Sequence, residues 1–247
     1  MTDHLLVTKE DGVATMTMNR PKARNALSMD MRLAMFDAVD DIEHDKSIRC
    51  VVLRGAGGHF MAGGDIKNFN EYLEMEPIER RTSFERRVHS LHAMMFALKR
   101  MEKPVIASVE GAAAGAGISF MTACDLAIGA DTSYYKFSYV GIGASPDGSG
   151  SYHLPRIVGV RKALEIAMLG DTFDAAEAHR LGLLNWMVPE ADIEAETNKL
   201  AQRLANGPTQ SYASIKRLMY ASHANSYAQQ LNLEAEGFGI CAATDDW

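Results

Sequence analysis

The chain has 247 residues, of which 47% are hydrophobic and 23% charged, and its formal net charge is -7 at pH 7. This length and composition are typical of a globular protein with a full core, and the negative charge argues against a nucleic-acid-binding surface. No apolar run approaches the about 18 residues of a membrane span, and the start of the chain lacks the basic and apolar regions of a signal peptide. We therefore expect a cytoplasmic protein without nucleic-acid partners or a membrane span.

The first half of the chain predicts strands that alternate with helices. Two apolar runs separated by Asp11-Gly12 predict a β-hairpin, and apolar residues at helical spacing after Ser28, a candidate cap, predict the first helix. The expected strands are 5–7, 13–18, 50–53, 104–109 and 126–128, and the expected helices are 31–42, 69–103 with a break at Pro77, and one that follows 111–117 and ends at 123. This alternation predicts an α/β core with parallel crossovers, in which sites gather at the carboxyl ends of strands.

After Gly159 the pattern becomes wholly helical. The expected helices are 161–169, 175–181, 193–204, 209–221 and 227–239, with Gly and Pro residues between them. Such a series of amphipathic helices predicts an appended layer that packs on the core or on another subunit.

Two glycine-rich segments, 55–65 and 111–117, each follow an apolar strand. Small residues at the amino end of a helix leave backbone N–H groups accessible, and two such groups that converge on one carbonyl oxygen would stabilise an enolate or a tetrahedral oxyanion. Tight strand-to-helix packing explains either segment alone equally well. Neither segment matches the phosphate-binding loop or the GxGxxG pattern.

The segment 143–150 places flexible glycines and Pro146 around a single carboxylate, Asp147. Considered alone, Pro-Asp-Gly favours a surface turn or a helix cap over a catalytic role. Metal ligands are not indicated, because the three cysteines lie far apart and the closest histidines, His89 and His92, lack a third ligand. We expect no metal site.

Five ordered blocks resemble the enoyl-CoA hydratase/isomerase (crotonase) family. They are Asn19-Arg20-Pro21 with Asn25-Ala26-Leu27, Phe60 to Ile66, Lys103 to Ala107 with Gly111 to Gly117, Ala123 to Leu126, and Leu154 to Gly159. The resemblance implies an α/β fold, with a crotonase-like spiral of ββα turns in 1–190 and a C-terminal helical trimerisation region in 191–247. It also implies a homotrimer or a dimer of trimers.

The resemblance further implies an acyl-CoA thioester as substrate, with coenzyme A present only as part of that thioester and no other cofactor. Carried over by position, the two backbone N–H donors that stabilise the thioester enolate fall on Gly64 and Ala116. Contacts with coenzyme A are expected from four residues, Arg24, Ala62, Asp65 and Ile66.

The choice of reaction depends on the carboxylates. Hydratases of the family use two glutamates, and the matching positions carry Ser119 and Tyr139, neither of which is a carboxylate base near neutral pH. Hydratase activity would therefore rest on the family name only. Asp147 resembles the carboxylate of family isomerases, including those of phenylacetyl-CoA degradation. As acid/base it would move a proton from C2 to C4 and so shift a carbon-carbon double bond.

Two alternatives remain open. In a 4-chlorobenzoyl-CoA dehalogenase-like hydrolase, Asp147 would be the nucleophile and His92 the base, while Tyr139 would take the place of a tryptophan; we rank this below isomerisation, because Gly64 replaces a bulky residue of those enzymes. A non-catalytic acyl-CoA-binding scaffold is the other alternative. In any of these, Tyr139 is expected to line the acyl pocket or donate a hydrogen bond.

Overall fold

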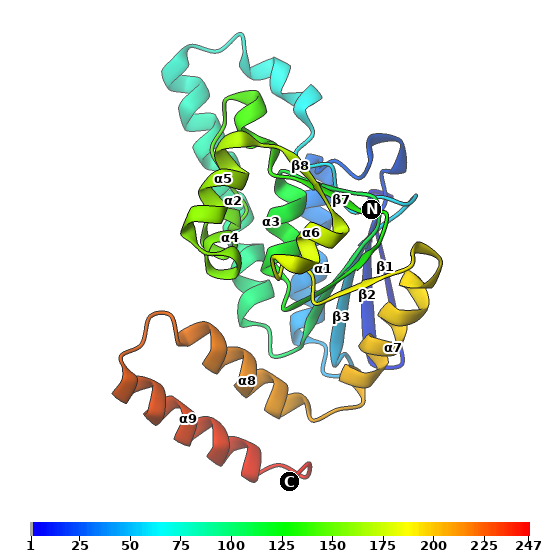
Figure 1. Ribbon diagram of the computed structural model, residues 1–247, viewed down its shortest axis with the longest axis vertical. Coiled ribbons are helices and arrows are strands. Elements are labelled where there is room, and N and C mark those ends of the chain that lie inside the picture. The colour runs from blue at the N-terminus through cyan, green and yellow to red at the C-terminus, as the bar shows by residue number, and fades with distance from the viewer. Residues whose placement is uncertain (1) are drawn as a thin grey trace.

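A computed structural model describes residues 2–247, apart from the side chain of Asn68. Its strands form a six-stranded sheet of order β1-β2-β3-β4-β6-β9 and a three-stranded sheet of order β5-β7-β8. Helices cover both faces of the larger sheet (Figure 1). The strand bounds are β1 (Leu5–Glu10), β2 (Val13–Met18), β3 (Cys50–Gly55), β4 (Val105–Val109), β5 (Ala112–Ala114), β6 (Leu126–Ala130), β7 (Tyr134–Lys136), β8 (Thr172–Asp174) and β9 (Trp186–Val188).

The predicted hairpin and parallel core are confirmed. β1 and β2 pair antiparallel through a turn in which Asp11 and Gly12 both have positive φ, the geometry that matches strand twist. β2, β3, β4, β6 and β9 then pair parallel to one another. All residues of β4 are buried, as expected for a central parallel strand covered on both faces.

The helices follow the predicted order with several additions. They are α1 (Met29–His44), α2 (Pro77–Arg100), α3 (Ala116–Ala123), α4 (Gly150–Val158), α5 (Val160–Leu169), α6 (Ala175–Arg180), α7 (Ile193–Ala205), α8 (Thr209–Ala221) and α9 (Tyr227–Ala242), with 3-10 helices η1 (Pro21–Ala23), η2 (Ile66–Tyr72), η3 (Ser138–Ile142) and η4 (Glu190–Asp192). Ser28 caps α1 as predicted, since its side chain accepts a hydrogen bond from the Met31 N–H at 3.2 Å. Pro77 begins α2, a position where its missing N–H is not needed.

The prediction that the chain is wholly helical after Gly159 is wrong. β8 pairs antiparallel with β7, and β9 extends the larger sheet beside β6. Both strands have three residues, too few to show an alternating pattern, and their partners in space define them. α4 was also missed, because Pro155 lies inside it and normally interrupts a helix.

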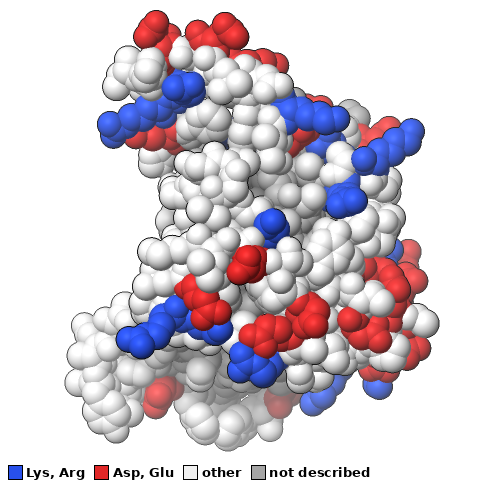
Figure 2. Space-filling model, turned by 45° about the horizontal axis from the view of Figure 1, so that its top comes forward, with Lys and Arg blue, Asp and Glu red and all other residues white. Residues whose placement is uncertain are grey.

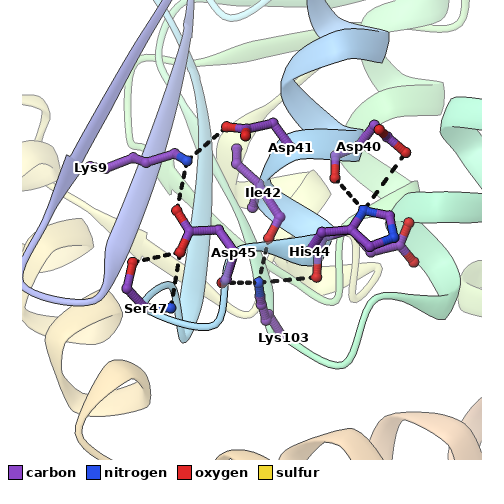
Figure 3. A network of polar contacts seen from close by, with 9 residues as sticks. Lys9, Asp40, Asp41, Ile42, His44, Asp45, Ser47 and Lys103 are labelled. Atoms are coloured by element: carbon purple, nitrogen blue, oxygen red, sulfur yellow. Dashed lines mark hydrogen bonds and ion pairs between the residues drawn. The ribbon is translucent and has the colours of Figure 1, made fainter.

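The carboxyl end of α1 is fixed by a buried lysine. The Lys103 ammonium donates to the carbonyl of Ile42 and, at 2.7 Å, to that of Asp45, which have no intrahelical partner (Figure 3). On the opposite side of Asp45, Lys9 binds its carboxylate and that of Asp41, each at 2.7 Å. This network joins α1 to β1 and to the helix-to-strand junction between α2 and β4.

The carboxyl-terminal part divides into a helix on the core and a projecting pair. α7 packs on the larger sheet, where Ile193, Ala201 and Ala205 join a buried cluster with β2, β3, β4 and β6. α8 and α9 pack together and extend from the body of the molecule at its lower end (Figure 1). The boundary expected at residue 190 thus lies between β9 and α7, whereas the projection begins at α8.

Surface charge is mixed. Figure 2 shows Lys and Arg side chains interspersed with Asp and Glu on the visible face. Within residues 2–247, no helix combines the length and apolar character that crossing a bilayer requires.

Candidate active site

A cavity of about 590 Å³ lies where segments from both halves of the chain meet. Its wall is formed by the loop after β3, the start of α3, the middle of α2 and the segment from η3 to Asp147. The lining residues are Leu27, Arg32, Ala62, Gly63, Gly64, Ile66, Phe69, Phe84, Arg87, Val88, Leu91, Gly115, Ala116, Lys136, Ser138, Tyr139, Gly141, Ile142, Ala144, Ser145, Pro146 and Asp147. Gly64, Ala116, Tyr139 and Asp147, predicted from widely separated positions, are thus brought together.

The backbone N–H of Gly64 points away from Leu27, the residue that pairs with Gly64 from the neighbouring segment. Leu27 donates to the Gly63 carbonyl at 2.8 Å and accepts from the Asp65 N–H at 3.3 Å, so both groups that flank Gly64 point toward Leu27. Because successive backbone polar groups alternate in direction, the Gly64 N–H points to the other side. No hydrogen bond is recorded for it among the described residues, and Gly64 lines the cavity.

The second predicted donor, Ala116, is the first residue of α3. First-turn N–H groups have no intrahelical acceptor, and the residue before it, Gly115, provides no side-chain cap. A Cβ built on Gly63 would lie 3.7 Å from the Ala116 nitrogen, so the two loops are in contact. Gly115 itself has φ +49, a conformation that L residues rarely adopt. The two loops that carry the predicted donors are thus in contact, and Gly64 and Ala116 both line the cavity.

Asp147 is held through one of its two oxygens. The Tyr139 hydroxyl donates to Asp147 Oδ1 at 2.7 Å, and the same hydroxyl lies 3.0 Å from Ser119 Oγ. Within the described part of the chain, no hydrogen bond or ion pair is recorded for Oδ2, and Asp147 lines the cavity. The carboxylate is therefore oriented by one oxygen and available through the other.

Ser119 is fully buried and lies behind the Asp147 loop. A Cβ built on Gly148 would be 3.2 Å from the Ser119 Cβ, and one built on Gly150 would collide with its hydroxyl. The loop therefore packs directly on Ser119, which does not line the cavity. A glutamate at position 119 would have to displace this loop.

Tyr139 is a poor base in this setting. Burial raises the pKa of its hydroxyl well above the usual range, and the neighbouring Asp147 charge raises it further. The neutral hydroxyl is thus a donor to Asp147, in agreement with the hydrogen-bonding role expected for Tyr139. Its ring also packs edge-on against Phe137, with centroids 5.0 Å apart.

His92 lies apart from this group. It is exposed on α2, its ring is 5.0 Å from that of His89, and it is not part of the cavity wall, although the neighbouring Leu91 is. The structure therefore does not bring His92 together with Asp147.

The four residues expected to contact coenzyme A are adjacent. The Ala62 N–H donates to the Arg24 carbonyl at 2.9 Å, and Ala62 and Ile66 both line the cavity. Arg24 is exposed, with its backbone in the left-handed region at φ 47. The Asp65 carboxylate is bound by the Arg20 guanidinium at 2.8 Å and makes no cap bond to η2. Asp65 thus fixes the loop through its side chain.

Sequence patterns did not single out Arg32, a buried cation in the cavity wall. A signal was present, because Arg32 is three residues before Met35 and seven before Val39, which are both buried on α1. A charged residue at helical spacing from apolar core residues indicates a buried polar position.

The chain also has a group of possible metal ligands outside the cavity, formed by Asp40, Glu43 and His44. Asp40 and His44 are exposed, and Glu43 is bound by Arg100 through both carboxylate oxygens, at 2.8 and 2.7 Å. This arrangement is an ordinary surface ion-pair cluster.

The sequence family follows from comparison with known proteins. The family model for enoyl-CoA hydratase/isomerase matches residues 8–247. The chain belongs to this family. Among curated relatives of this enoyl-CoA hydratase/isomerase family member, 4-chlorobenzoyl coenzyme A dehalogenase-2 of Arthrobacter sp is 36% identical over 214 residues, which are 86% of this chain and 76% of the relative. The 1,2-epoxyphenylacetyl-CoA isomerase of Escherichia coli K12 is 33% identical, covering 100% of this chain and 93% of the relative.

Solved structures agree with this assignment. An enoyl-CoA hydratase from Polaromonas sp. JS666 superposes with a TM-score of 0.88 at 34% identity, covering 96% of this chain and 90% of the other. An enoyl-CoA hydratase from Mycobacterium smegmatis gives a TM-score of 0.89 at 30% identity, covering 99% and 92%. The predicted crotonase-like α/β fold is confirmed. The relatives include a hydratase, an isomerase and a dehalogenase, so the family alone does not define the reaction.

Proposed function

We propose that this family member is an enoyl-CoA isomerase in which Asp147 is the acid/base. The observation that carries the proposal is the position of Asp147 in the same cavity wall as Gly64 and Ala116, with Oδ1 held by Tyr139 and no partner recorded for Oδ2 among the described residues. Among the described lining residues it is the only carboxylate. A single base beside two N–H donors is sufficient to move a double bond.

In the proposed reaction the thioester oxygen of a 3-enoyl-CoA lies between the N–H groups of Gly64 and Ala116. Asp147 Oδ2 removes a proton from C2, and the electron pair of that C–H bond forms an enolate whose negative charge the two donors stabilise. The protonated Asp147 then returns the proton to C4. The double bond moves to C2–C3, and no water is consumed.

Hydration is disfavoured by the surroundings of Ser119 and Tyr139. Water addition in this family uses two carboxylates, whereas here one position is a buried serine covered by the loop and the other is a tyrosine whose hydroxyl already donates to Asp147. Neither residue can hold and deprotonate a water near neutral pH.

Dehalogenation is the second candidate, because the Arthrobacter dehalogenase is 36% identical to this chain. In that reaction Asp147 would attack a chlorinated ring carbon, expel chloride and leave an aryl ester for a water molecule to hydrolyse. His92 would have to activate that water, and its exposed position outside the cavity supports isomerisation instead.

The remaining features belong to the same proposal. Coenzyme A, as part of the substrate, would contact Arg24, Ala62, Asp65 and Ile66, and no other cofactor would be needed. The α8–α9 pair exposes Met219, Phe238 and other apolar side chains, which suits the proposed trimer or dimer of trimers. We also propose a cytoplasmic location.

The test is a substrate panel with purified protein. Wild type is assayed with trans-3-enoyl-, trans-2-enoyl- and 4-chlorobenzoyl-CoA, beside Asp147→Asn and His92→Gln. The proposal expects isomerisation of the 3-enoyl thioester that Asp147→Asn abolishes and His92→Gln leaves intact. Chloride release that depends on His92 would favour the dehalogenase, and binding of all three thioesters without turnover would favour the scaffold.

A further inference from the structure

Arg32 is a buried cation whose surroundings the proposed reaction does not explain. Its residue surface is 5% exposed, and it extends from the buried face of α1 into the wall of the cavity that holds Asp147. Removing a guanidinium from water is unfavourable unless hydrogen bonds and an opposite charge offset the loss of hydration.

Only part of that guanidinium is satisfied. Its Nη2 donates to the carbonyl of Arg87 and to Ser90 Oγ, both on α2, which fixes one branch of the planar group. Among the residues that the structure describes, no hydrogen bond is recorded for Nε or Nη1, and neither Arg32 nor Arg87 forms an ion pair with a carboxylate. The remaining donors are left for the contents of the cavity.

The charges in the cavity wall do not balance. Arg32, Arg87 and Lys136 line the cavity, whereas the described carboxylates contribute Asp147 alone. Arg87 lies over the Phe69 ring at 5.2 Å from its centroid. Burial lowers the pKa of Arg32, and the charge of Arg87 lowers it further, against the opposing effect of Asp147. Two like charges close enough to repel each other beside an apolar cavity form a site for an anion.

We propose that Arg32, with Arg87 beside it, binds a carboxylate carried on the distal part of the acyl group. The substrates would then be enoyl-CoA thioesters of dicarboxylic acids, and this assignment of substrate class rests on the proposed function. Phe84, Val88 and Leu91 supply apolar wall for the hydrocarbon between the thioester and the carboxylate. The Nε and Nη1 donors that remain can each give a charge-assisted hydrogen bond to a carboxylate oxygen.

Binding of saturated thioesters tests the proposal without any turnover. Dissociation constants of adipoyl-CoA and hexanoyl-CoA, which have acyl chains of equal length, are measured by calorimetry. Wild type is expected to bind adipoyl-CoA at least about tenfold more tightly, the effect of one hydrogen-bonded ion pair. Arg32→Met should remove this preference and leave hexanoyl-CoA binding nearly unchanged, whereas Arg32→Lys should retain part of it. Arg86→Met, an exposed neighbour on α2, is the matched control and should behave as wild type.

Two results would overturn the proposal. One is equal affinity of the wild type for both thioesters, a measurement that requires no variant to fold. The other is an equal loss of both affinities in Arg32→Met with unchanged circular dichroism, which would assign Arg32 to the coenzyme A portion. Failure of the isomerase proposal would be recognised separately. A protein that turns over no enoyl-CoA can still be tested for its preference for adipoyl-CoA, because this measurement depends on binding alone.

Discussion

Two aspartates of this protein have the same kind of neighbour and different surroundings. Asp147 accepts from the Tyr139 hydroxyl at 2.7 Å, and Asp125 accepts from the Tyr220 hydroxyl at 2.9 Å. Asp125 also accepts from the Val105 N–H at 2.8 Å and pairs with the Lys216 ammonium at 2.7 Å. Both oxygens of Asp125 are thus occupied by structural partners, whereas Asp147, which lines the cavity, has one oxygen without a recorded partner among the described residues.

This difference distinguishes a carboxylate with a structural role from the proposed acid/base. The partners of Asp125 come from β4 and α8, so its charge ties the projecting helix pair to the sheet. Asp147 joins no two distant elements, and its single partner orients it. A carboxylate with unused acceptor capacity in a cavity is the one that can exchange a proton with a ligand.

The largest expected effect is on turnover. Asp147→Asn should lower kcat for trans-3-enoyl-CoA by about 10³-fold, because the amide cannot accept the proton, and should change acyl-CoA affinity by less than about threefold. Steady-state kinetics together with calorimetric binding would check this. A large loss of affinity with unchanged kcat would show that Asp147 only binds substrate.

The corresponding substitution of Asp125 should lower the stability of the fold. Asp125→Asn leaves the Lys216 ammonium, whose side chain is 8% exposed, without its counter-charge. We expect a loss of about 2–4 kcal/mol in the free energy of unfolding, with turnover per folded molecule preserved. Urea unfolding measures the first quantity. If Asp125→Asn were as stable as wild type, Asp125 would not anchor α8.

Removing the hydroxyl of Tyr139 or of Tyr220 should also distinguish the roles of Asp147 and Asp125. Tyr139→Phe is expected to lower kcat about tenfold, because Asp147 loses the donor that orients it, with a small change in stability. Tyr220→Phe is expected to lower the free energy of unfolding by about 1 kcal/mol and leave kcat unchanged. Equal effects of the two variants on kcat would contradict the distinction.

The smallest effect concerns pH and Lys99. Its ammonium nitrogen is buried without a hydrogen-bond partner among the described residues, over the Tyr220 ring at 3.2 Å from the centroid. Burial lowers the pKa of Lys99 to about 8 from its usual 10.5. Between these two values the unfolded chain binds more protons than the folded one, so wild type should gain stability as pH rises through this window.

Lys99→Met removes this titration. Relative to that variant, wild type should be less stable by about 1 kcal/mol below pH 8, and the difference should diminish toward pH 10.5. Urea midpoints at several pH values for the two proteins provide the measurement. A difference that stays constant over this range would show that Lys99 titrates normally in the folded state.

Much of the fold could be predicted from the sequence, because long periodic segments such as 31–42 and the apolar run of β4 define their own structure. The exceptions depended on partners distant in the chain. β8 and β9 are strands only because β7 and β6 pair with them, and nothing within their three residues indicates this.

The candidate site shows the same division. Asp147 could be selected from the resemblance of its loop to that of family isomerases and from the absence of carboxylates at Ser119 and Tyr139, the positions that the same resemblance assigns to the hydratase glutamates. The sequence could not predict that these three side chains form one hydrogen-bonded chain, because η3 and the packing of the loop on α3 determine it. The helical spacing of Arg32 to Met35 and Val39 indicated a buried position, but its hydrogen bond to Ser90, 58 residues away, required the tertiary structure.

The most direct test of the role of Asp147 is to identify the product. Purified protein is incubated with trans-3-hexenoyl-CoA, and the thioesters formed are resolved by nuclear magnetic resonance for wild type and Asp147→Asn. We predict that wild type forms 2-hexenoyl-CoA without accumulating 3-hydroxyhexanoyl-CoA, and that Asp147→Asn forms neither. Accumulation of the 3-hydroxy product by wild type, or an unchanged rate of isomerisation in Asp147→Asn, would contradict Asp147 as the acid/base of an isomerase.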